Sequence, residues 1–190
     1  MQRLSPVLRY SVLMILLAVA VVSGGCSVTV MPNKVPPVSG LDAVSLTGVS
    51  LIITNAEQDP SLYDVPNDKG QKLGILVNRQ AWSKVLVETL ASELAGRGAQ
   101  VRVNAPLKLA IMLPDIMFNQ IKSNYQFKVK VAVSSSSGWA KTYDAVAQTE
   151  SGLFESSDAL MDRLAGQVLA EATKAMLSDA EFLVQLRGKS

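Results

Sequence analysis

The sequence predicts an α+β fold, a two-layer sandwich in which a mostly antiparallel sheet carries two long helices on one face and a short C-terminal helix. Three observations lead to this fold class. Apolar and polar residues alternate over several short stretches, as they do in half-buried strands. Two longer stretches, 79–97 and 159–177, place apolar residues three or four apart, as on one face of a helix. The central strands have links of hairpin length, which favours antiparallel pairing, and the two helices need a sheet to cover.

The N-terminus has the order of residues that is typical of an export signal. Met1 to Tyr10 carries Arg3 and Arg9, and an apolar run from Ser11 to Val22 follows. This run of about 12 residues is shorter than the roughly 20 that a membrane-spanning helix needs. We therefore predict a lipoprotein signal peptide over 1–25, with an anchor that is never cleaved as the alternative.

The only cysteine of the chain, Cys26, directly follows the small residues Ser23, Gly24 and Gly25. This order resembles the lipobox of bacterial lipoproteins, although Ser23 stands where leucine is usual. In a lipobox, cleavage precedes the cysteine and a diacylglycerol is attached to it. We therefore predict cleavage between Gly25 and Cys26 and lipidation of Cys26 with acyl chains such as palmitate. An ordinary signal peptide with a chance cysteine after it is the alternative.

The residue after the cysteine is Ser27. In Gram-negative lipoproteins, Asp at this place favours retention in the inner membrane. Ser27 therefore favours the outer membrane, with the folded part in the periplasm. Pro32, Pro36 and Pro37 block helix formation in the stretch 26–45. We expect this stretch to hold the lipidated cysteine and an extended tether that reaches about 40 Å from the membrane.

A single domain is expected over 46–190, because the chain is too short for two well-formed cores. In order, its expected elements are strands over 49–54 and 73–77, a helix over 79–97, strands over 99–103, 107–113, 125–133 and 139–150, and helices over 159–177 and 178–186.

The elements of the first half have distinct local signals. Val49, Leu51 and Ile53 mark the alternation of the first strand. A polar loop rich in turn-forming residues separates it from the second strand. Asn78 can cap the first long helix, and Gly96 and Gly98 supply its stop.

The second half contains the clearest strand, over 125–133, in which every second residue is apolar. Pro114 indicates an edge or a bulge at the end of the strand before it, because proline cannot donate to a ladder. Ser156, Ser157 and Asp158 each offer a cap for the second long helix. Ser178 begins a capping box with Glu181, so a short helix is expected to start there. That helix is too short to be stable alone and must pack on its own body or on a partner.

Several segments are typical of one protein family. They are Asn78-Arg79-Gln80 at the start of the first helix, Arg97-Gly98 at its end, Asn104-Ala105-Pro106-Leu107 before a strand, the strand from Tyr125, Glu150-Ser151-Gly152-Leu153-Phe154, and the short helix around Phe182. In these segments and in its layout, the chain resembles the YajG-like family of uncharacterised bacterial outer-membrane lipoproteins. The resemblance implies an exported, lipid-anchored domain with no assigned reaction.

The sequence contains no histidine, which excludes Ser-His-Asp and Cys-His catalysis and the common imidazole metal sites. Glu88 and Glu93 lie five residues apart on the first helix and do not share a face. Asp158 and Asp162 lie four apart, but Asp158 is explained by its place in the first helical turn. We therefore expect no catalytic residues and no enzyme.

An acidic loop contains Asp59, Asp64 and Asp68, and calcium prefers such oxygen-rich loops. The spacing misses the EF-hand pattern, so we expect a turn-rich loop, no metal and no other cofactor. Lys128 and Lys130 share the outer face of one strand. They form either a patch for anionic lipid headgroups, lipopolysaccharide or an acidic partner, or a solvated sheet face that lysines protect from aggregation.

The charge balance bears on the partners. Loss of Arg3 and Arg9 with the signal peptide leaves 16 of the 18 basic residues against 16 acidic ones. A neutral chain argues against nucleic-acid binding. Its contacts should instead use a local surface, for which the strand over 107–113 and the C-terminal helix are the candidates.

The leading interpretation is a non-enzymatic, lipid-anchored interaction or assembly module of the bacterial cell envelope. Its partners would be the membrane, through the lipid anchor, and an envelope protein or a second copy of the chain. The alternative is an accessory lipoprotein that handles lipid, lipopolysaccharide or polysaccharide in a transport system. That function would need an apolar cavity between helices and sheet. A hydrolase that uses carboxylates is the third hypothesis.

Overall fold

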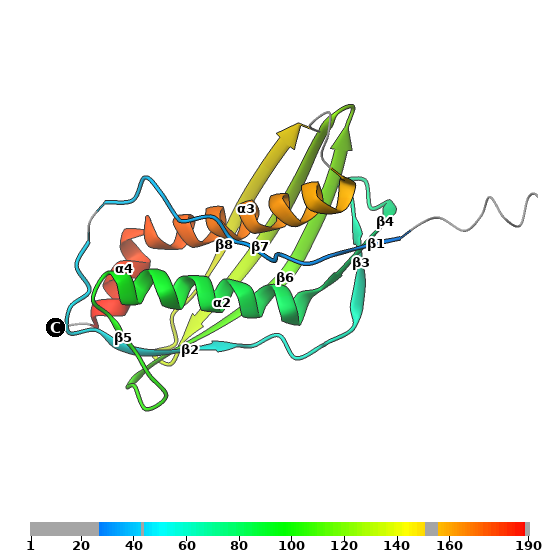
Figure 1. Cartoon of the computed structure of the whole chain (residues 1–190). Helices are drawn as coiled ribbons and strands as arrows, with labels where there is room; N and C mark the ends of the chain where they lie inside the picture. The colour runs from blue at the N-terminus through cyan, green and yellow to red at the C-terminus, as the bar shows by residue number, and fades with distance from the viewer. Residues whose placement is uncertain (1–26, 43, 151–155, 189–190) are drawn as a thin grey trace, which may run out of the picture.

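The computed structural model describes residues 27–42, 44–150 and 156–188, which form an α+β fold (Figure 1). The predicted signal peptide, with Gly25 and Cys26, and the family segment 151–154 lie outside the described residues. The elements are β1 (Val28–Val30), β2 (Ser50–Asn55), β3 (Leu62–Pro66), β4 (Lys72–Asn78), α2 (Arg79–Gly96), β5 (Gln100–Val101), β6 (Leu107–Ile121), β7 (Asn124–Ser135), β8 (Ala140–Glu150), α3 (Ser157–Leu177) and α4 (Ala180–Arg187). Within these ranges, no helix has the length and hydropathy that crossing a bilayer requires.

The strands form two sheets. The large sheet has the order β5-β2-β6-β7-β8 and curls, and the small sheet has the order β1-β4-β3. The antiparallel meander β6-β7-β8 is as predicted. The expectation of one mostly antiparallel sheet is not confirmed, because the strands form two sheets and β2 pairs in parallel with both β5 and β6. Parallel pairing needs a long crossover, and β3, β4 and α2 supply it between β2 and β6.

The strand β6 continues well beyond the predicted end at residue 113. Its register with β7 shifts between Met112 and Asp115, so a bulge surrounds Pro114. The bulge predicted at this proline is therefore confirmed. Because proline has no N–H to donate, a bulge lets the chain pass it and resume the ladder as far as Ile121.

The two long helices begin at the predicted caps. The side chain of Asn78 accepts a hydrogen bond from the Ala81 N–H at 2.8 Å, and that of Ser156 accepts one from the Ala159 N–H at 3.3 Å. Figure 1 shows α2 and α3 next to each other across the large sheet, and α3 packs chiefly on β8 and β7. Their wholly or almost wholly buried residues include Trp82, Leu86, Leu90, Leu94, Leu160, Leu164, Val168, Ala172 and Met176.

The chain from 28 to 41, here called the N-terminal strap, packs on the body of the protein. It begins as β1, which pairs in parallel with β4, and the side chain of Val30 is wholly buried. It then runs along α3, where the Met31 N–H and the Asn33 side-chain amide donate to the Asp162 carboxylate over 3.1 and 2.7 Å. Figure 1 shows the strap crossing the helices before it turns back toward β2.

The residues of the strap belong to the stretch 26–45, which the sequence predicts to be an extended tether. A side chain at Gly166 would overlap the carbonyl oxygen of Lys34, so the missing Cβ lets the strap lie directly on α3. Prolines forbid helix in an extended chain, but they do not decide whether that chain is solvated or docked. The strap is extended, as the sequence predicts, but it packs on the body of the protein and does not reach away from it.

Candidate functional site

Two of the four acidic residues considered as catalytic pairs, Glu88 and Asp162, have structural partners. Glu88 forms an exposed ion pair with Lys84 at 3.9 Å, one helical turn away. Asp162 accepts the two hydrogen bonds that hold the strap. Among the described residues, no group of three His, Cys, Asp or Glu side chains is placed to hold a metal ion.

The acidic loop does not gather its carboxylates. Asp59 accepts a hydrogen bond from the Ser61 N–H at 2.9 Å, and the contact with Ser61 lowers the pKa of Asp59. Asp64 lies within the strand β3, whereas the sequence predicts a loop at this position. Because β3 is the edge of the small sheet, it tolerates Pro66 at its end. Asp68 lies in the next turn and pairs with Lys128.

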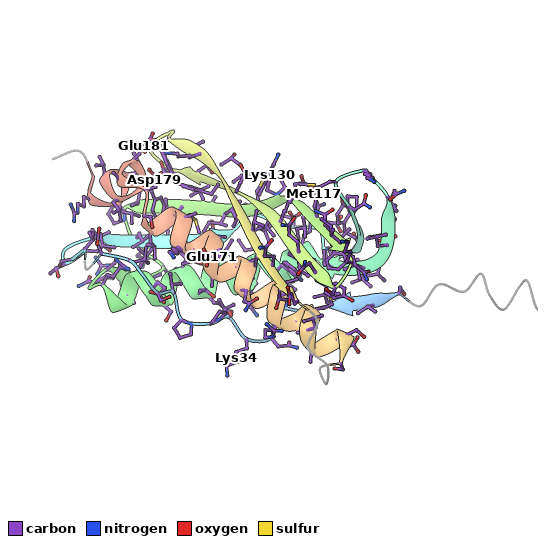
Figure 2. All side chains as sticks on the ribbon, turned by 90° about the horizontal axis from the view of Figure 1, so that it is seen from above. Lys34, Met117, Lys130, Glu171, Asp179 and Glu181 are labelled. Carbon is purple, nitrogen blue, oxygen red and sulfur yellow. The ribbon has the colours of Figure 1, made fainter. Side chains whose placement is uncertain are left out.

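The outer face of the large sheet carries the two lysines singled out in the sequence. Figure 2 shows Lys130 and Met117 on the side of the sheet away from Glu171 of α3. Lys128 donates to the Asp68 carboxylate over 2.8 Å, and this bond is the main reason why the pKa of Asp68 is lowered. Lys130 lies opposite Asp115 on β6 and Asp144 on β8. Acids therefore accompany both lysines, which favours a solvated sheet face over a basic patch.

The C-terminal helix α4 packs on its own body. Phe182 and Leu186 are buried, and the ring of Phe182 lies 6.0 Å from that of Trp139 and 6.3 Å from that of Tyr143. The N-cap of the helix lies one residue later than predicted, because Asp179 caps α4 while Ser178 ends α3. One of the two expected docking surfaces is thus already covered.

Five side chains around the start of α4 form the C-terminal polar cluster: Trp139, Lys141, Tyr143, Asp179 and Glu181. Lys141 bridges the two acids, with its Nζ 2.9 Å from Asp179 Oδ2 and 2.8 Å from Glu181 Oε2. The Tyr143 hydroxyl donates to Asp179 over 2.6 Å, and the Trp139 indole N–H donates to Glu181 over 2.9 Å. Figure 2 shows both acids together at this end of the molecule.

The cluster shifts the pKa values of its members. Partial burial opposes ionisation of Asp179, but the hydrogen bonds from Tyr143, Lys141 and the Glu181 N–H outweigh it, so the pKa of Asp179 is lowered. The bond from Lys141, followed by that from Trp139, lowers the pKa of Glu181. Burial and the bond to Asp179 raise the pKa of Tyr143 above its usual range. Each acid is ionised near neutral pH and has partners, so the cluster holds α4 in place.

The second expected docking surface, the strand over 107–113, is not an edge. It belongs to β6, which lies between β2 and β7. The long free edge is β8 instead, whose 11 residues end the large sheet, and within the described chain no strand pairs with its outer side. A groove beside β8 separates it from Pro36 and Pro37 of the strap, over Gln167 and Lys174 of α3.

This free edge is the candidate functional site, and sequence reasoning missed it. Alternation along 139–150 shows which side chains are buried, but it carries no information on whether a neighbour lies beyond the strand. A long unpaired edge is a template for another strand, and proteins normally shorten, cover or charge such edges.

No protein-family model matches this chain, and no curated protein matches it either. Among solved structures, protein XCC0632 from Xanthomonas campestris, of family DUF330, is similar with a TM-score of 0.53 and 15% identity over 80% of this chain and 93% of that one. A Caulobacter crescentus protein proposed to be a lipoprotein has a TM-score of 0.45 and 12% identity over 74% and 93% of the two chains. The PelC dodecamer from Paraburkholderia phytofirmans has a TM-score of 0.33 and 14% identity, over 75% of this chain and 95% of that one. The chain thus shares the fold of XCC0632.

Proposed function

We propose that the protein is a lipid-anchored interaction module of the bacterial cell envelope that catalyses no reaction. In this proposal, cleavage before Cys26 and its acylation attach the domain to the outer membrane, with the fold in the periplasm. The order of charged, apolar and small residues before Cys26 supports the anchor. The resemblance to the YajG-like lipoproteins supports the same assignment.

The free edge of β8 is the observation that carries the interaction role. A strand from a partner can add to such an edge, since main-chain hydrogen bonds give affinity and alternate side chains give specificity. On β8 the exposed side chains include Thr142, Asp144, Val146 and Gln148. They offer both charge and apolar area to a strand of an envelope protein or of a second copy.

The competing function, a carrier for lipid or polysaccharide, needs open apolar space between the helices and the sheet. That layer is instead filled by large side chains. Trp82 packs edge-to-face on Phe127 with ring centroids 5.3 Å apart, and Leu86 and Leu164 are wholly buried beside this layer. A filled layer supports the interaction module over the carrier.

Photo-crosslinking in intact cells tests the proposal. A photoreactive residue in place of Gln148, at the free edge, should trap one discrete partner. The same residue in place of Glu88, which is exposed on α2, serves as the matched control. Adducts from Glu88 alone, or none from either position, would contradict the role of the β8 edge.

The other parts of the proposal have separate tests. Cys26→Ala should release the domain from membranes, and a variant that stays bound in high salt would show that another anchor exists. Purified domain should not turn over ester, peptide or glycoside probes. Turnover that disappears when a single acidic residue is replaced would overturn the non-enzymatic assignment.

A further inference from the structure

The docked strap leaves very little chain between the body and a membrane. β1 begins at Val28, two residues after Cys26. Two residues of extended chain span about 7 Å. If the apolar run up to Val22 were instead retained as the anchor, six steps of chain would span at most about 22 Å. With either anchor, the end of the molecule at which β1 begins must face the membrane closely.

Two turns lie at this same end. Because β1 runs parallel to β4, with Val28 opposite Ile75, the chain enters beside the start of β4. The turn 67–71, which joins β3 to β4, is therefore located there. The tip of the β6–β7 hairpin lies against it, and one groove is lined by both turns, Lys69 and Leu73 on one side and Ile121 and Lys122 on the other. Figure 1 shows β1, β3 and β4 together on one side of the molecule.

Five residues of the two turns form what is here called the hairpin patch: Lys69, Lys72, Leu73, Ile121 and Lys122. Ile121 is 65% exposed and Leu73 is 42% exposed, so the two turns present apolar area to their surroundings. The three lysines are exposed around them. Asp68 in the same turn is already paired with Lys128, so it leaves the patch lysines available.

Lys122 has a backbone that lysine rarely adopts. Its φ of 58° lies in the left-handed region, and it is the only residue other than glycine with a positive φ among those described. Glycine or asparagine would adopt this conformation at a lower cost in stability. Lys122 is the first residue of the two-residue loop between β6 and β7, and tight hairpin loops of this length use a positive φ at this position.

We propose that the hairpin patch rests on the surface of the bilayer that holds the N-terminal anchor. Ile121 and Leu73 lie among the lipid headgroups, and the three lysines contact lipid phosphates. This inference rests on the anchor in the proposed function. Each contact is weak alone, but the anchor makes docking intramolecular, so a weak surface contact is enough to orient the domain.

The test uses the acylated full chain reconstituted into phosphatidylethanolamine and phosphatidylglycerol vesicles. An environment-sensitive fluorophore is attached to the new cysteine of the Ile121→Cys variant. Labelling is specific for this position, because acyl groups block Cys26, the only natural cysteine. The control is Val103→Cys, at an apolar residue that is 81% exposed and lies near the other end of β6. Lipids that carry a quencher at headgroup depth should reduce the emission of the Ile121→Cys probe and leave that of the Val103→Cys probe unchanged.

The outcomes separate this inference from the anchor. A chain that sediments with vesicles while the probe at 121 stays unquenched overturns the hairpin patch and leaves the anchor intact. Equal quenching at both positions overturns the patch as well, because the domain would then have no fixed orientation. A chain that does not sediment with vesicles overturns the anchor, and this inference fails with it.

Discussion

The indole N–H of Trp82 donates a hydrogen bond to the carbonyl oxygen of Val30 over 3.0 Å, and both side chains are wholly buried. One residue belongs to α2 and the other to the end of β1. The bond therefore connects the helix layer to a segment that the sequence assigns to a tether. A buried carbonyl that loses its donor costs about 1–3 kcal/mol, so this contact has a measurable share in stability.

Trp82→Phe keeps an aromatic ring in the core but removes the donor to Val30. We expect the free energy of unfolding to fall by about 1–3 kcal/mol, measured by equilibrium denaturation in urea. Trp139→Phe is the control, because it removes a more exposed indole bond to Glu181 and should cost less. An unchanged unfolding midpoint for Trp82→Phe would show that β1 is not docked in solution.

Gly166→Ala should displace the strap, because the added methyl group would overlap the Lys34 carbonyl. The expected result is a loss of stability together with faster proteolysis of the chain before residue 41. Gly96→Ala is the matched control, since Gly96 is also helical and has open space where its Cβ would be. Alanine there should be neutral or slightly stabilising. Similar behaviour of the two variants would argue against close packing of the strap on α3.

Leu90→Asp and Leu164→Asp should each unfold the protein or lower its melting temperature severely. Both leucines are wholly buried, one on each long helix, and a carboxylate there would have no partner. Circular dichroism on heating measures the effect. A melting temperature close to that of the natural chain in either variant would mean that the corresponding helix face is not part of the core.

The C-terminal polar cluster predicts how stability depends on pH. The pKa values of Asp179 and Glu181 are lowered by folding from ordinary values of 3.8 and 4.5. Their contribution is therefore complete above those ordinary values and is lost as the pH falls through the lowered ones. The pKa of Lys141 is raised above 10.5 and that of Tyr143 above 10.0, so their contributions fade in alkali.

Thermal unfolding between pH 2 and 7 tests the acidic side of this prediction. The natural chain should lose stability below about pH 4. Asp179→Asn should be less stable near neutral pH and should lose less on acidification. Glu88→Gln is the control, because Glu88 has only an exposed ion pair. Parallel pH curves for the natural chain and Asp179→Asn would rule out a contribution from Asp179.

The sequence predicts those parts of the fold that depend on local pattern. Alternation from Tyr125 to Val133 identifies the buried face of β7, and Asn78 and Ser156 mark the starts of the two long helices. Pairing partners are different, because periodicity assigns a face and not a neighbour. The parallel ladder of β2 with β6 joins residues more than 50 positions apart, so nothing in either segment indicates it.

The candidate site was harder to predict for the same reason. Whether β8 or β6 forms an edge is decided by the order of all strands, which no single segment encodes. The docking of the strap depends on partners far along the chain, among them Asp162 and the space left by Gly166. In contrast, burial of Phe182 could be expected, because a helix of this length is unstable alone and must pack on its own body or on a partner.

The strap also sets the order in which the chain can assemble. The Met31 N–H finds its acceptor on Asp162, 131 residues later, and Val30 finds the Trp82 indole 52 residues later. Contacts of such separation form slowly, since the intervening loop must close first. The part of the strap that follows β1 therefore docks only after α3 has formed. Until β4 has formed, β1 has no strand to pair with, and until α3 has formed, the segment after β1 lacks its acceptor on Asp162.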